Sequence, residues 1–103
     1  MNVLASGPAE RPDRPASAIL YDHEHARVVG FNLLPGQKVA AHRSDSTVTI
    51  HVTFGTGTFR GADAEYTLSA GEVAVFEPGE MHAMDAGAEP LRFIAVITPR
   101  PGG

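Results

Sequence analysis

Alternating hydrophobic and polar residues mark the chain as a succession of short β-strands. The clearest is segment 48–54, in which apolar and polar residues alternate: Val48, Ile50, Val52 and Phe54 against Thr49, His51 and Thr53. This alternation with many β-branched residues is typical of a strand that buries one face. Similar apolar runs occupy segments 18–21, 27–34, 58–60, 65–68, 72–76 and 91–98. Because Gly and Pro separate these runs, the pattern predicts about eight short strands in an all-β sandwich or small barrel.

The composition fits one small domain with a polar arm and tail. The chain has 103 residues, 43% of them hydrophobic, with 11 Gly and 8 Pro. This length provides a single core, and the many turn-forming residues disfavour long helices. Proline interrupts residues 1–16, which have no apolar period, so we expect an N-terminal arm there. We expect the barrel domain over residues 17–98 and a frayed tail over 99–103.

Charge and cysteine content exclude several classes of function. The formal net charge is −4, and a nucleic-acid binder is therefore disfavoured, because phosphate contacts need a basic face. No apolar run approaches the length of a membrane span, and the N-terminus has no signal-peptide pattern. We therefore expect no membrane or nucleic-acid partner and a cytoplasmic location. Cysteine is absent, so disulfides, thiolate metal sites and a cysteine nucleophile are excluded.

Two stretches combine glycines and histidines at fixed spacings. In the first, Gly36 precedes His42, and Gly55 follows it; in the second, segment 71–82 runs from a glycine through Pro78 and Gly79 to His82. These stretches resemble the two motifs of the cupin superfamily, and most closely the small single-domain bacterial cupins related to quercetin dioxygenases. The resemblance implies a cupin fold, a double-stranded β-helix or jelly-roll barrel of short antiparallel strands.

The resemblance also implies a metal site, of which this chain retains a part. His42 and His82 stand at family ligand positions, whereas Ser44 and Val48 replace the second histidine and the glutamate. Imidazole suits Mn, Fe, Ni, Cu or Zn, so a divalent transition metal is the expected cofactor. His51 is the candidate for a third ligand. Strict alternation turns His51 away from the face of Val48, and a bulge in the strand would turn it inward.

A predicted substrate pocket surrounds these histidines and is mainly apolar. Its predicted residues are Phe31, Phe54, Phe76, Glu77, Met84 and Phe93. Glu77 could orient His82 or act as an acid or base. The histidines of the Asp22–His25 stretch are better explained as part of a solvated hairpin tip.

Three functions follow from the resemblance. The first is a metal-dependent enzyme of the dioxygenase or isomerase type that acts on a small organic molecule. The second is a non-catalytic module that binds or senses such a molecule. The third is a degenerate cupin without metal. Because family members commonly pair through their sheets, we expect a homodimer.

Overall fold

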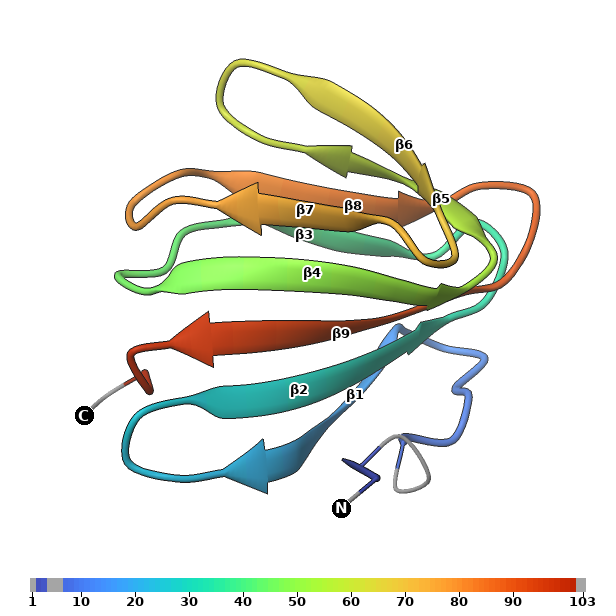
Figure 1. Ribbon diagram of the computed structural model, residues 1–103. Coiled ribbons are helices and arrows are strands. Elements are labelled where there is room, and N and C mark those ends of the chain that lie inside the picture. Colours follow the sequence, from blue (N-terminus) through green and yellow to red (C-terminus); the bar gives the residue numbers. More distant parts are fainter. Residues whose placement is uncertain (1, 4–6, 102–103) are drawn as a thin grey trace.

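Nine antiparallel strands make up the fold, which a computed structural model describes for residues 2–3 and 7–101 (Figure 1). Their bounds are β1 (Ala16–Asp22), β2 (Arg27–Leu33), β3 (Lys38–His42), β4 (Thr47–Phe54), β5 (Thr56–Arg60), β6 (Glu65–Ser69), β7 (Val73–Phe76), β8 (His82–Ala86) and β9 (Leu91–Thr98). The described residues contain no α-helix and no helix long and apolar enough to cross a membrane. The all-β prediction is confirmed.

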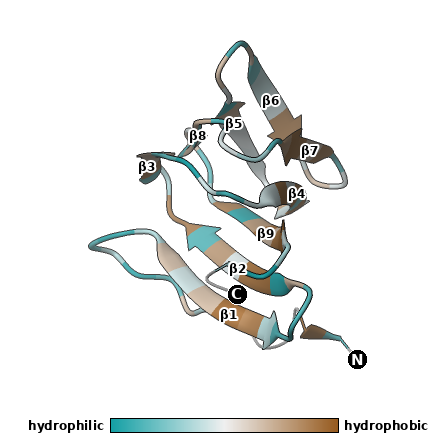
Figure 2. Cartoon of the chain, turned by 90° about the vertical axis from the view of Figure 1, so that its left-hand side faces the viewer, coloured by the Kyte–Doolittle hydropathy of each residue, from teal (hydrophilic) through white to brown (hydrophobic). Residues whose placement is uncertain are grey.

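The strands form two sheets that enclose the core. One sheet has the order β1-β2-β9-β4-β7 and the other the order β3-β8-β5-β6. Hydrophobic residues concentrate on the strands, and hydrophilic residues on the loops between them (Figure 2). The buried side chains at the centre come from both sheets: Leu33, Val48, Ile50, Val52, Phe59, Leu68, Phe76, Met84, Ala86, Leu91, Phe93 and Ala95. Removing each large side chain from water contributes about 1.5–3 kcal/mol to folding, so this cluster holds the sheets together.

Strand β4 follows the predicted alternation until its last residues. Val48, Ile50 and Val52 are buried, whereas His51 is only partly buried, on the opposite face. The prediction is wrong for Phe54, because the pairing with β9 shifts register between Val52 and Phe54. The extra residue of such a bulge changes the side on which the following side chain emerges. Phe54 is 50% exposed and lies against Arg92 instead of in the core.

Strands β3 and β8 were absent from the sequence prediction. They pair with each other, with Lys38 opposite Asp85 and His42 opposite His82. Their sequences contain alanine, methionine, aspartate and only one β-branched residue, so their intrinsic strand preference is weak. Pairing within the four-stranded sheet decides their conformation.

The chain ends lie against the five-stranded sheet where the structure describes them. The predicted arm (1–16) and tail (99–103) include residues 1, 4–6, 102 and 103, which lie outside the described residues. In the arm, the carbonyl oxygen of Pro8 accepts a hydrogen bond from the Asn32 side chain at 3.3 Å. In the tail, Arg100 Nε donates to Asp22 at 2.7 Å. Arg100 thereby lowers the pKa of Asp22 to about 2, with a second contribution from Arg27.

Candidate functional site

Two histidines meet at one end of the four-stranded sheet. His42 is the last residue of β3 and His82 is the first residue of β8, and the two are register partners. Their ring centroids are 4.1 Å apart, with an angle of 66° between the ring planes. Each histidine directly borders a loop, so the ladder between β3 and β8 brings two sequence motifs into contact. The structure therefore brings together the two residues at which the motifs end.

Both imidazoles are oriented by backbone carbonyl groups. His42 Nδ1 lies 3.0 Å from the carbonyl oxygen of Ala40, and His82 Nδ1 lies 3.1 Å from that of Glu80. A carbonyl oxygen only accepts hydrogen bonds, so Nδ1 carries the proton in each ring. In a neutral histidine of this tautomer, Nε2 is the acceptor. Each ring therefore keeps a lone pair on Nε2.

The two histidines differ in their exposure to water. His42 is exposed, whereas His82 is 2% exposed and its ring stacks on Phe76 at a centroid distance of 5.0 Å. Burial lowers the pKa of His82, and the neighbouring His42 lowers it further, against the hydrogen bond to Glu80. His82 is therefore neutral near pH 7 and able to accept a hydrogen bond or a metal ion.

The carboxylate of Glu80 links two loops near the histidine pair. Glu80 accepts hydrogen bonds from the backbone N–H of Glu77 at 3.0 Å and of Ala62 at 3.3 Å. These two bonds join the turn before β8 to the hairpin tip between β5 and β6. The sequence analysis did not identify this role of Glu80. A carboxylate three residues after Glu77, in a Pro-Gly turn, is the signal that could have revealed it.

The other predicted metal ligands do not join the pair. His51 shares the outer face of β4 with Thr49, opposite the buried Val48. Within the described residues, no three His, Asp or Glu side chains converge to form a metal site. Ser44 and Val48 offer no imidazole or carboxylate at the positions where the family has them. The donors present therefore do not fit a metal held by the protein alone.

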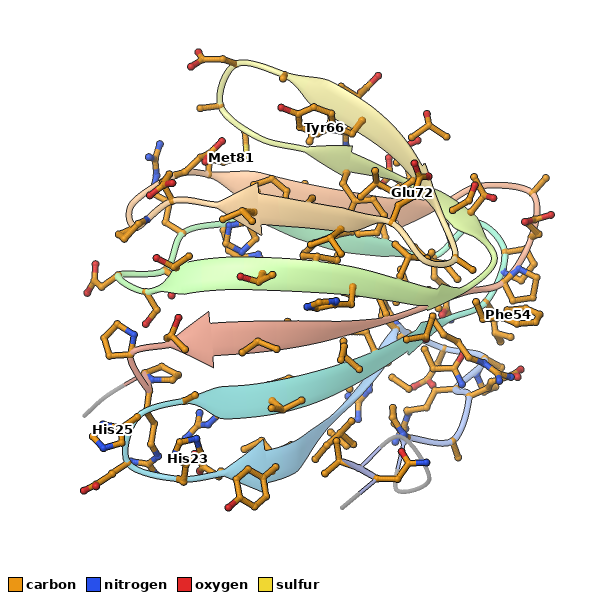
Figure 3. All side chains as sticks on the ribbon, viewed as in Figure 1. His23, His25, Phe54, Tyr66, Glu72 and Met81 are labelled. Carbon is orange, nitrogen blue, oxygen red and sulfur yellow. The ribbon has the colours of Figure 1, made fainter. Side chains whose placement is uncertain are left out.

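The predicted pocket residues separate into three environments. Phe76, Met84 and Phe93 are at most 2% exposed and belong to the core. Phe31 is partly buried against the core, and its ring stacks on that of Phe93 with the centroids 4.7 Å apart. Phe54 is half exposed at the end of the five-stranded sheet (Figure 3).

Three further titratable side chains lie on loops. The side chain of Glu77 is exposed beside the turn that precedes β8. His23 and His25 occupy the exposed β1–β2 loop, at the far end of the view in Figure 3 from Phe54. Among the described residues, these loops contribute to no group of three His, Asp or Glu side chains that could hold a metal ion.

Comparison with known proteins agrees with this architecture. Residues 30–97 match the family described as Cupin domain. An oxalate-binding protein of Thermotoga maritima is 31% identical over 78 residues, which cover 73% of this chain and 64% of that protein. The chain thus spans somewhat less than two thirds of this relative's length.

Solved structures reproduce the whole fold. A protein from Thermus thermophilus superposes with a TM-score of 0.90 at 24% identity, covering 98% of both chains. A protein with a double-stranded β-helix domain from Klebsiella pneumoniae gives a TM-score of 0.85 at 25% identity, covering 96% of this chain and 88% of its own. The two sheets therefore form a double-stranded β-helix, as the sequence predicts.

Proposed function

Because the chain belongs to the Cupin domain family, we propose that it binds a small organic acid at the paired imidazoles of His42 and His82. The observation that carries this proposal is the anchoring of both Nδ1 atoms on carbonyl oxygens, which turns both Nε2 atoms into acceptors. Two adjacent acceptors are complementary to a ligand that donates O–H groups or brings a proton with it. The name of the oxalate-binding relative supports a small carboxylate as the ligand class.

Binding of a carboxylate at this pair requires a proton. A neutral imidazole accepts at Nε2, and a carboxylate also accepts, so one of the partners must be protonated before they can bond. The complex therefore takes up a proton as it forms. Affinity should increase as the pH falls, because the proton that the complex requires is then easier to supply.

A divalent transition metal is the second candidate ligand. A metal-binding histidine commonly donates its other ring nitrogen to a carbonyl or carboxylate, and both His42 and His82 have this arrangement. Mn, Fe, Ni, Cu or Zn would gain only two protein ligands here, so a bound acid or water must supply the remaining donors. Such a metal would provide Lewis-acid chemistry for an enzyme of the dioxygenase or isomerase type. The His51 side chain would join only after a rearrangement of β4.

Titration of the protein with oxalate tests both candidates. The protein is purified without a polyhistidine tag, and the imidazole signals of His42 and His82 are followed by NMR, with and without Zn²⁺. We expect saturable shifts of both rings with oxalate alone, loss of binding in His82→Ala, and normal binding in the control His25→Ala. Binding that appears only with Zn²⁺ would favour the metal candidate. Absence of any shift under both conditions would overturn the proposal.

We also propose that the chain pairs with a second copy through its five-stranded sheet. Val73 and Val75 lie on β7, the edge strand of this sheet, and are 49% and 53% exposed, and an edge strand with exposed apolar side chains can pair with another chain. A second copy would remove them from water. Sedimentation at several concentrations should give twice the 10.9 kDa chain mass. Replacement of both valines by lysine should then give a monomer, and a monomeric wild type would contradict the proposal.

A further inference from the structure

A concave site lies outside the barrel, beneath the N-terminal arm. This cleft has a volume of about 580 Å³. It lies at the end of the five-stranded sheet where β2 and β4 finish and β9 starts, beside the arm and Phe54 (Figures 1 and 3). Its principal lining groups come from the arm and these strands: Pro8, Glu10, Gly30, Asn32, Phe54 and Arg92. Clefts of this size are typical of sites for small organic ligands.

The arm that covers the cleft is held by exchangeable polar contacts. Arg92 Nη2 lies 3.3 Å from Glu10 Oε1, and both side chains are nearly half exposed. Asn32 Nδ2 donates to Pro8 across 3.3 Å, and Gln37 Nε2 donates to the Arg11 carbonyl oxygen at 2.7 Å. An exposed ion pair contributes little to stability, so another carboxylate can replace Glu10 on Arg92 at small cost.

Arg92 is arranged to receive such a carboxylate. Its guanidinium lies over the Phe54 ring, 5.0 Å from the centroid. A guanidinium stacked on an aromatic face still has the N–H groups of its edge available for a carboxylate. Phe54 is half exposed because of the bulge in β4, so its ring also offers apolar surface to the body of a ligand.

Asn32 adds an unused acceptor beside Arg92. The residue is 7% exposed, and its Oδ1 atom is buried with no hydrogen-bond partner among the described residues. An unpaired buried acceptor costs free energy that a ligand N–H or O–H group can recover. With the arm in place this atom is covered, so a donor would reach it only as the arm shifts.

We propose that this cleft binds a small carboxylic acid with an aromatic body. The carboxylate takes the place of Glu10 on Arg92, and the body packs against Phe54. A hydroxyl or amino substituent on the body donates to Asn32 Oδ1. The proposal does not depend on the histidine pair, because Arg92 and Asn32 belong to the outer face of the other sheet, in register with each other on β9 and β2.

Titration of the full chain with benzoate tests the proposal, with benzamide as the uncharged control. Backbone amide shifts in NMR spectra locate the ligand, and we expect saturable shifts at Gly30, Asn32 and Ile94 with benzoate only. Arg92→Gln should weaken benzoate binding at least ten-fold, because it removes the cation that receives the carboxylate. Glu10→Gln should strengthen binding up to about five-fold, because it removes the competing carboxylate.

The opposite effects expected of Arg92→Gln and Glu10→Gln on benzoate affinity distinguish binding in this cleft from nonspecific binding. Arg92→Lys keeps the charge without the planar fork and should bind between wild type and Arg92→Gln. His25→Ala, on the distant β1–β2 loop, should bind like wild type. The proposal is overturned if benzoate causes no saturable shifts, if it shifts only the amides around His42 and His82, or if Glu10→Gln weakens binding.

Discussion

Two glycines with nearly the same positive φ should respond very differently to replacement by alanine. Gly36 has a φ of 80° and Gly55 a φ of 79°. A Cβ on Gly36 would meet no atom within 4 Å, whereas a Cβ on Gly55 would overlap the carbonyl oxygen of Pro90. The pair thus separates the cost of a left-handed backbone from the cost of a close approach between two chain segments.

The expected magnitudes follow from this difference. A non-glycine residue at positive φ costs about 1–2 kcal/mol, which a stiffer unfolded chain partly offsets. Gly36→Ala should therefore reduce the free energy of unfolding by about 1 kcal/mol, or about 4–8 °C in Tm. Gly55→Ala must also displace the backbone at Pro90, so we expect a loss of more than about 4 kcal/mol, close to the whole stability of a small domain.

Urea denaturation followed by far-UV circular dichroism measures both losses, because the chain has no tryptophan to report by fluorescence. Gly71→Ala provides a matched control, since Gly71 has a φ of 92° and open space around it. It should behave like Gly36→Ala. If Gly55→Ala lies within about 0.5 kcal/mol of these two variants, the close contact with Pro90 does not determine the choice of glycine.

Three other predictions concern charged groups. The pKa of His82 is lowered in the folded state, so the unfolded chain binds more protons below pH 6.5. The free energy of unfolding should therefore fall as the pH drops from 6.5. This fall should be smaller in His82→Gln than in the control His25→Gln. Glu80→Gln should cost about 1–2 kcal/mol and speed amide exchange in the two turns that Glu80 joins, and unchanged exchange would count against this role. The Asp22 carboxyl should titrate in NMR with a pKa of about 2, and Arg100→Gln should raise that value; a midpoint near 3.8 in wild type would disprove the contact.

The strands that could be predicted from the sequence are those with alternating apolar and polar residues and many β-branched side chains. Segment 48–54 has alternating β-branched residues, and its prediction as a strand is confirmed. Strands β3 and β8 lack that signal, and they are the strands that carry His42 and His82. Their conformation depends on pairing between segments about forty residues apart, which local preference does not encode. The motif spacing identified both histidines, but their register partnership required the fold.

The bulge in β4 marks a second limit of sequence reasoning. Alternation assigns Phe54 to the core side, and a single inserted residue reverses that assignment. No residue type in this segment indicates the bulge, because Thr53 is compatible with both a regular strand and a bulged one. The same bulge places the Phe54 ring on the outside of the sheet, where the Arg92 guanidinium lies over it. The cleft beneath the arm therefore could not be predicted from the alternation of apolar and polar residues alone.

The origin of both histidines in a single sheet has a mechanical consequence. His42 and His82 are register partners on adjacent strands, so the β3–β8 ladder sets the distance between their rings. A sliding or opening motion of one sheet against the other would change the core without separating the two side chains. The spacing of the two imidazole rings should therefore stay constant when the distance between the two sheets fluctuates. A ligand would meet the same ring spacing in each of these conformations.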